Sequence, residues 1–179
     1  PGQEDNMHDH YPFTGYILDG GKAQVTMPDG KVNEREFPSG FIAHNGNGVR
    51  HKVKNIDSND INVILIEHKK LGSIPNFDNN VKLSAHEVSP DIYEIVHEDE
   101  LIKVYTATFP AGSGDNVHEH GMNTAYVITG GKVEITGADG SVNERNIPDG
   151  AVLHSDKLVR HQVKNIGTTD IKVLLAEYK

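Results

Sequence analysis

GSGDNVHEHGMNTAYVITGGKVEITG, at residues 112–137, aligns without a gap with GQEDNMHDHYPFTGYILDGGKAQVTM at residues 2–27. The alignment continues to the end of the chain, so that residues 2–69 reappear as residues 112–179. Self-similarity over so long a stretch is typical of a duplicated domain, whereas solenoid repeats are shorter, at roughly 20 to 45 residues. We therefore predict two related domains in this chain of 179 residues.

Both copies consist of short runs in which apolar and polar residues alternate, separated by turns that carry glycine, proline and aspartate. Examples of these turns are Asp19-Gly20-Gly21 and Pro148-Asp149-Gly150. The pattern predicts an all-β fold of the sandwich or barrel type. The strands expected in the first copy and ahead of the second are Thr14–Leu18, Lys22–Thr26, Val32–Phe37, Phe41–His44, Val49–Ile56, Ile61–His68, Glu94–His97 and Leu101–Phe109.

The segment between the copies divides the chain. Residues 71–83 contain proline, glycine and several asparagines, which predicts a linker between a first domain at 1–70 and a second at 84–179. The hairpin expected ahead of the second copy has no counterpart in the first. On this ground we expect the N-terminal barrel to lack its first strands here, and the natural protein to carry further residues before Pro1.

Composition restricts the partners and the location. The net charge is −9 and the pI is near 5.6, so we expect no nucleic-acid partner, because phosphate binding needs a clustered positive field. No apolar run approaches the roughly 20 residues that cross a bilayer, so we expect no membrane partner. Cysteine is absent, which excludes disulfides and thiolate ligands. We expect a small-molecule substrate, and a homodimer is possible. We expect a cytoplasmic location. A periplasmic or secreted location is the alternative, because the expected upstream residues could include a signal peptide.

Four histidines recur at matching positions in the two copies. Residues two apart in a strand face the same side of the sheet, so His118 projects together with His120. The same spacing joins His8 and His10 in the first copy. These pairs therefore predict two imidazoles on one face of a strand in each domain.

A further histidine in each copy is expected to point into the barrel. His161 shares a strand face with the apolar Val159 and Val163, and His51 has the same surroundings in the first copy. Converging imidazoles in an apolar interior need partners, because burying an unpaired polar group costs a few kcal/mol. A divalent transition metal meets this need, because neutral imidazole is a good ligand for Zn, Fe, Ni or Cu, and we favour Fe(II), Zn or Ni. We predict up to one metal ion per domain, on the sets His8, His10, His51 and His118, His120, His161.

These motifs resemble those of the cupin superfamily, and in particular its two-domain members, the bicupins. The first cupin motif, a glycine, five residues and His-x-His, is matched at residues 2–10 and 112–120. The second, a Pro-x-Gly turn followed by a histidine and then an asparagine, is matched at 38–55 and 148–165, with a longer gap after the turn than usual. The resemblance covers nearly the whole chain and implies two tandem barrels of the double-stranded β-helix, or jelly-roll, type.

One departure from the family pattern concerns a fourth ligand. Many cupins place a glutamate three residues before a Tyr-Val pair, and here that position holds Asn123 in the second copy and Phe13 in the first. The resulting three-histidine site resembles that of cupin dioxygenases and departs from oxalate-degrading members, which use manganese and that glutamate. Further residues expected to line the pocket or to orient a ligand are Tyr16, His44, Glu67, Asn123, Tyr126, His154 and Glu177.

The resemblance implies a metal-dependent bicupin, and the three-histidine set favours a non-haem Fe(II)-type dioxygenase acting on a small oxygen-rich substrate. One alternative is a Zn- or Ni-dependent lyase or isomerase. Another is a non-catalytic bicupin that binds a metal or a small molecule. We favour an enzyme, although the sequence identifies neither a nucleophile nor a general base.

Overall fold

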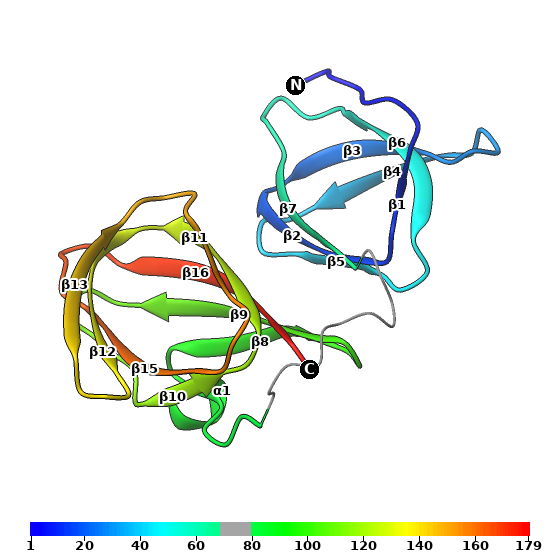
Figure 1. Ribbon diagram of the computed structural model, residues 1–179. Coiled ribbons are helices and arrows are strands. Elements are labelled where there is room, and N and C mark those ends of the chain that lie inside the picture. The colour runs from blue at the N-terminus through cyan, green and yellow to red at the C-terminus, as the bar shows by residue number, and fades with distance from the viewer. Residues whose placement is uncertain (69–79) are drawn as a thin grey trace. The chain divides into compact units, whose positions relative to one another are not determined.

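A computed structural model describes residues 1–68 and 80–179 (Figure 1). The chain divides into two compact units, Pro1–Ile74 and Pro75–Lys179. Most of the expected linker, residues 71–79, lies outside the described residues. Both units are built from antiparallel sheets, which confirms the all-β prediction. In the described part of the chain, no helix combines the length and apolar character that a membrane crossing requires.

The N-terminal unit contains two sheets, with strand orders β1-β6-β3-β4 and β5-β2-β7. Strands β2 to β7 each lie within a few residues of their expected positions, and β1 carries the His-x-His pair. The bounds are β1 His8–His10, β2 Phe13–Asp19, β3 Gly21–Thr26, β4 Val32–Phe37, β5 Ile42–Asn45, β6 Val49–Asn55 and β7 Asn62–Glu67.

The C-terminal unit repeats this plan and extends it. Its sheets have the orders β10-β15-β12-β13 and β14-β11-β16-β9-β8. The short helix α1 (Ala85–Val88) precedes them; the sequence did not predict it, because a single turn shows no helical periodicity. The strands are β8 Tyr93–Glu98, β9 Ile102–Phe109, β10 His118–His120, β11 Asn123–Thr129, β12 Gly131–Gly137, β13 Val142–Ile147, β14 Val152–Ser155, β15 Val159–Asn165 and β16 Ile171–Tyr178.

The Pro-x-Gly turns of the two copies are alike in backbone conformation. Gly40 has a φ of 83° and Gly150 a φ of 75°. A side chain at these values is strained, so glycine is the residue that the turn requires. Each turn precedes two strands, β5 and β6 or β14 and β15, and the second of these carries the third histidine of its copy.

The units differ at one edge of the second sheet. In the C-terminal unit the expected hairpin β8–β9 is confirmed, and β9 pairs with β16 along its whole length. In the N-terminal unit, β7 ends its three-stranded sheet. Val63 and Leu65 of β7 are accordingly 44% and 39% exposed, whereas Leu175 of β16 is only 6% exposed. The added hairpin therefore closes the C-terminal barrel over its interior.

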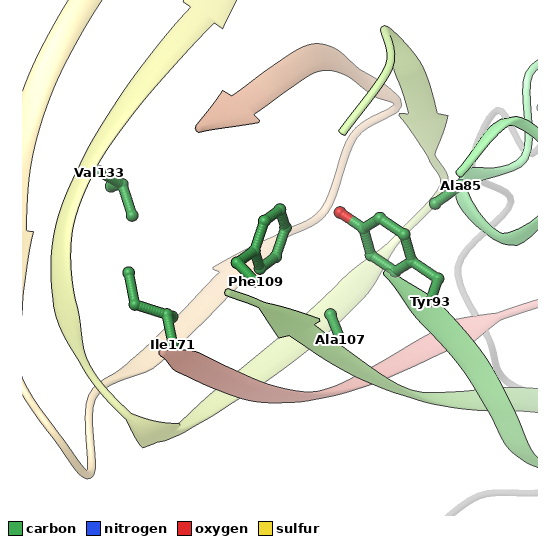
Figure 2. Close-up of a cluster of buried hydrophobic side chains, with 6 residues drawn as sticks. All are labelled: Ala85, Tyr93, Ala107, Phe109, Val133 and Ile171. Carbon is green, nitrogen blue, oxygen red and sulfur yellow. The ribbon is translucent and has the colours of Figure 1, made fainter. Parts of the chain in front are cut away.

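The closing hairpin forms much of the C-terminal core (Figure 2). Tyr93 of β8 and Phe109 of β9 pack edge to face, with ring centroids 5.9 Å apart and an interplanar angle of 84°. Aromatic pairs in this arrangement add attraction beyond the burial of their surface. The cluster joins the two sheets of the unit and consists of Ala85, Tyr93, Ala107, Phe109, Val133 and Ile171.

Replacement of Phe109 by alanine is expected to cost about 3–5 kcal/mol of unfolding free energy, because it leaves a cavity in a core position that is 5% exposed. Urea denaturation measures the loss, and hydrogen exchange in peptides from β9 and β16 assigns it to the C-terminal unit. Phe41, which is 44% exposed, is the control, with an expected cost below about 1 kcal/mol for the same change. Equal losses in the two variants would contradict the assignment.

Candidate metal centre

Strand pairing brings the histidines of the C-terminal unit together. β10 pairs with β15 in a register that places His118 opposite His161. His120 lies two residues along β10 and so shares the face of His118. The register is repeated in the N-terminal unit, where His8 lies opposite His51. The local alternation that the sequence revealed and the pairing of distant strands together produce the two clusters.

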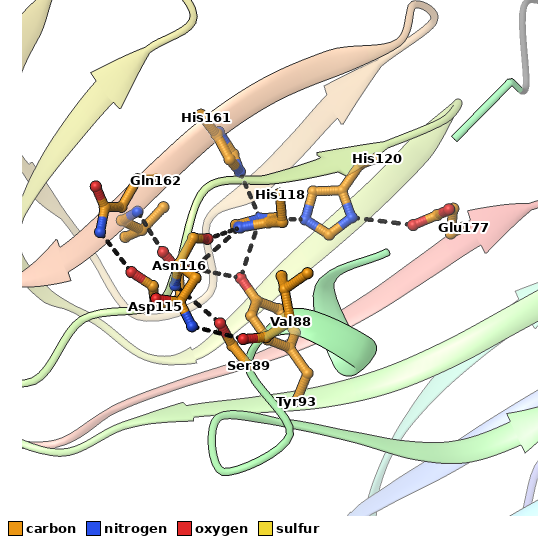
Figure 3. Close-up of polar contacts among 11 residues, drawn as sticks. Val88, Ser89, Tyr93, Asp115, Asn116, His118, His120, His161, Gln162 and Glu177 are labelled. Atoms are coloured by element: carbon orange, nitrogen blue, oxygen red, sulfur yellow. Dashed lines mark hydrogen bonds and ion pairs between the residues drawn. The ribbon is translucent and has the colours of Figure 1, made fainter. Parts of the chain in front are cut away.

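The three C-terminal imidazoles converge through their Nε2 atoms (Figure 3). The Nε2 atom of His118 lies 2.9 Å from that of His120 and 3.0 Å from that of His161. One nitrogen of each ring lies within 4.8 Å of the others, which is the arrangement that a single ion requires. The cluster is enclosed, since the side chain of His118 is fully buried and that of His120 is 6% exposed.

The other ring nitrogens determine where the hydrogens lie. His118 Nδ1 lies 2.9 Å from the carbonyl oxygen of Asn116, and His120 Nδ1 lies 2.9 Å from Glu177 Oε2. Both oxygens accept, so each Nδ1 donates and each neutral ring presents a bare Nε2 lone pair. Two lone pairs 2.9 Å apart repel unless a cation lies between them. The donor set therefore fits a divalent transition metal bound by neutral imidazoles.

Burial keeps the His118 and His161 rings uncharged at neutral pH. Desolvation and, to a smaller extent, the nearby His120 together lower the pKa of His118 to about 3. The same two causes, in the same order, lower the pKa of His161 to about 4. Since a metal ion competes with protons for the imidazole lone pair, rings that resist protonation are prepared to bind one.

A tyrosine and an aspartate adjoin the cluster (Figure 3). The Tyr93 hydroxyl donates to Asp115 Oδ2 at 2.8 Å, and its oxygen lies 3.3 Å from His118 Nε2. The backbone N–H of Val163 donates to Asp115 Oδ1 at 2.7 Å. Burial raises the pKa of Asp115 to about 6, and burial together with the Asp115 charge raises the pKa of Tyr93 well above its usual value. A pair able to hold or pass a proton thus lies beside the converging nitrogens.

Sequence reasoning did not single out this pair. Tyr93 lies in the hairpin that has no counterpart in the first copy, so the repeat could not draw attention to it. Asp115 did leave a signal, because Asp5 stands at the matching position. The Asp5 carboxylate accepts from the Val53 N–H at 2.6 Å, just as Asp115 accepts from its own partner on β15. The repeated aspartate therefore anchors the loop before each His-x-His strand.

The N-terminal cluster has the same plan with less cover. His8 Nε2 lies 2.7 Å from His10 Nε2, and the His51 ring centroid lies 5.1 Å from both of theirs. His10 Nδ1 lies 2.8 Å from Glu67 Oε1, which repeats the Glu177 contact of the other unit. The His8 side chain is 35% exposed, whereas its C-terminal counterpart is fully buried. Water therefore reaches the N-terminal cluster more freely.

A cavity of about 240 Å³ lies beside the C-terminal cluster, between the two sheets of the barrel. His120, His161 and Tyr93 form one part of its wall, and Asn123 lies with them. Asn123 Nδ2 donates to the carbonyl oxygen of Gly121 at 2.8 Å, so the amide is held in place. The corresponding position in the N-terminal unit is filled by Phe13, which packs against His10 with ring centroids 5.4 Å apart. The two units thus differ at the fourth-ligand position.

The remaining residues expected near the pocket lie at its edge or away from it. His154 lines the cavity, and its Nδ1 atom lies 2.8 Å from Thr124 Oγ1. In the N-terminal unit, His44 Nδ1 lies 3.1 Å from Thr14 Oγ1. Tyr126 lies on the opposite face of β11 from Asn123, with its hydroxyl near Gly150. Tyr16 takes the equivalent place near Gly40. Tyr126 therefore lies outside the cavity lining, and Tyr16 is buried, with 5% of its surface exposed.

The chain matches no family model and no curated protein, but its fold matches that of solved structures. AerE from Microcystis aeruginosa superposes with a TM-score of 0.70 at 15% identity, over 100% of this chain and 83% of that one. The oxalate decarboxylase of Bacillus subtilis, a protein with Mn(II) centres, gives 0.64 at 15% identity, over 99% and 66%. A cupin 2 conserved barrel domain protein from Leptotrichia buccalis gives 0.52 at 14% identity, over 99% and 79%. The chain has the bicupin fold.

Proposed function

We propose that the C-terminal unit binds one divalent transition metal through His118, His120 and His161 and that this centre is catalytic. The observation that carries the proposal is the convergence of three Nε2 atoms beside a cavity, with His118 Nε2 lying 2.9 Å from His120 Nε2 and 3.0 Å from His161 Nε2. An amide, Asn123, stands where a carboxylate would complete the site of many cupins. An all-imidazole set favours Fe(II), Zn or Ni over the manganese of the oxalate decarboxylase neighbour.

The activity that we propose is that of a non-haem Fe(II)-type dioxygenase acting on a small oxygen-rich substrate. A bound Fe(II), which His118, His120 and His161 would hold, would supply a redox-active Lewis acid. The protein's own residues perform the other tasks. Asn123 presents a fixed amide to the substrate, the apolar wall excludes water, and Glu177 holds the His120 ring in orientation.

Metal analysis of native protein, purified without chelators, tests this function, followed by oxygen uptake with the iron-loaded protein. We expect up to one metal equivalent per unit and oxygen consumption that depends on an added small chelating substrate. Protein that binds no Fe(II), Zn or Ni when these are added at stoichiometric concentration would overturn the metal proposal. If the protein binds metal but its turnover is unchanged without oxygen, the dioxygenase proposal is overturned and the proposal of a metal centre stands.

One observation favours a second candidate, a Zn- or Ni-dependent lyase or isomerase. Such reactions need a proton to be moved, and the Tyr93–Asp115 pair lies beside the centre with a 2.8 Å hydrogen bond between the two side chains. The N-terminal unit, within residues 1–68, contains the matching Asp5 but no counterpart of β8. On this candidate we propose that proton transfer belongs to the C-terminal unit. Oxygen-independent turnover distinguishes it from the dioxygenase.

Replacement of Glu177 by glutamine is expected to weaken metal binding at the C-terminal centre by roughly tenfold, because the outer hydrogen bond of a ligating imidazole tunes its basicity and orientation. Glutamine keeps the shape and can still accept from His120 Nδ1, so the change tests the carboxylate charge. Competition titration against a chelator of known affinity measures the effect. Glu67→Gln is the matched control, since it alters His10 in the other unit. An unchanged affinity in Glu177→Gln would count against a ligand role for His120.

A further inference from the structure

The cavity beside the C-terminal centre is apolar apart from the groups at the metal end. Side chains from both sheets form its wall, including Phe109, Val133, Ile135 and Leu175. Within residues 1–68 and 80–179, no lysine or arginine lines it. Arg160, which neighbours His161 in β15, points to the other face and lies 3.3 Å from Glu119 Oε1. A substrate with two negative charges therefore meets no protein cation in this space.

The charges near the centre are themselves negative. Glu177 contacts His120 Nδ1 at 2.9 Å, and Asp115 lies 3.5 Å from His118 Nδ1. A divalent ion among these groups attracts one anionic chelating group. A second negative charge would lie near these carboxylates if it were part of the chelating head, or against the apolar wall if it were free. Burial of an unpaired charge is strongly unfavourable. Small dicarboxylates are therefore poor occupants of the cavity.

The volume of the cavity indicates the size of the apolar group that it can hold. Its volume is about 240 Å³. A dry apolar cavity of about 150 Å³ is sufficient to hold benzene. The space therefore holds an apolar group of the size of a phenyl ring together with a short chelating head, with the head at the histidine end and the ring against Val133 and Leu175.

Resting on the metal site proposed for this unit, we infer that the substrate of the C-terminal centre has a chelating pair of oxygens, no more than one negative charge, and an apolar group of about phenyl size attached directly to the chelating head. The imidazoles and Asn123 select the head. The wall between the sheets selects the apolar group.

Three probes test this inference on the full-length chain loaded with Co(II), whose visible spectrum reports both metal binding and ligand binding. Acetohydroxamate and benzohydroxamate share one chelating head and differ in the apolar group, and oxalate is a dianionic chelator. We expect benzohydroxamate to bind about tenfold to a hundredfold more tightly than acetohydroxamate, given the apolar area that a phenyl ring buries. We expect oxalate to bind more weakly than either. Metal content is measured after each titration, so that loss of cobalt to a probe is not counted as binding.

A cavity-filling variant provides the second arm. Ala125 is 7% exposed and lines the cavity, so Ala125→Leu is expected to remove the preference for benzohydroxamate and leave the affinity for Co(II) unchanged. Val152→Leu, at a position 63% exposed, is the matched control and should retain the preference. Co(II) binding with equal affinities for the two hydroxamates in wild type overturns the inference alone. Absence of Co(II) binding by the histidines overturns the proposed function beneath it.

Discussion

Alanine at position 161 is expected to remove the metal ion from the C-terminal unit. Four-ligand structural zinc sites bind with about 10–16 kcal/mol, so the loss of one of three ligands should weaken affinity by on the order of a hundredfold or more. His161 is only partly buried, and its Nε2 lies 3.0 Å from that of His118. The change therefore removes a converging nitrogen at small cost to the fold. Equilibrium dialysis with Zn(II) and elemental analysis measure the loss, and turnover should disappear with the metal.

His51→Ala is the control for this prediction because it alters the matching residue of the other unit. His51 lies opposite His8 in the register that places His161 opposite His118. The control variant should keep the C-terminal metal and its activity. Circular dichroism and hydrogen exchange verify that both variants are folded. If His161→Ala still binds metal at the C-terminal unit as tightly as wild type does, the three-histidine site is wrong.

Replacement of Tyr93 by phenylalanine is expected to lower turnover by about a hundredfold or more if the reaction moves a proton, because a general acid or base usually contributes a factor of this size. The hydroxyl donates to Asp115 at 2.8 Å and lies 3.3 Å from His118 Nε2, so it adjoins the converging nitrogens. The ring itself packs against Phe109 and is retained in the variant. Steady-state kinetics should show the loss in kcat, with little change in metal affinity.

Tyr105→Phe distinguishes a chemical role of the Tyr93 hydroxyl from a structural one. Tyr105 is also fully buried, and its ring centroid lies 6.4 Å from that of Tyr93. Its variant should keep turnover within about twofold of wild type, since surface and core changes remote from reacting atoms act mainly on stability. The pH profile of kcat adds a readout that packing alone would not move. A Tyr93→Phe enzyme with the wild-type kcat and pH profile would remove the support for the lyase or isomerase.

Much of the fold could be predicted from local pattern. The alternation around Val32–Phe37 and Val49–Asn55 marks strands, and the structure confirms them with little shift of their ends. The repeat identified the histidines, because a spacing of two residues is enough to place His118 and His120 on one face. Strand register could not be predicted in the same way. It depends on which distant strands pair, and this decided that His118 lies opposite His161.

The sequence predicted the additional hairpin of the C-terminal unit but not that this hairpin reaches the metal cluster. The difference between the two units lies largely outside their aligned residues, since both copies keep the same three histidines and the same glutamate. It arises from β8 and β9, which add two strands beside β16 and carry Tyr93 to the cluster. The two units also differ at the position that holds Asn123 in the second copy and Phe13 in the first. The sequence shows only that the residues differ. The structure shows that Asn123 lines a cavity, whereas Phe13 packs against His10.

By itself, the sequence determined the duplication, the all-β character and the faces that the histidines share, because strand alternation and turn chemistry are properties of neighbouring residues. Only the tertiary structure decided that the C-terminal cluster is enclosed, that the Nδ1 contacts of His118 and His120 leave their Nε2 atoms bare, and that Tyr93 and an apolar cavity adjoin the cluster. These features arise where strands distant in the chain meet, as Glu177 of β16 meets His120 of β10. Their energies depend on burial and on the exact approach of side chains, which local pattern does not encode.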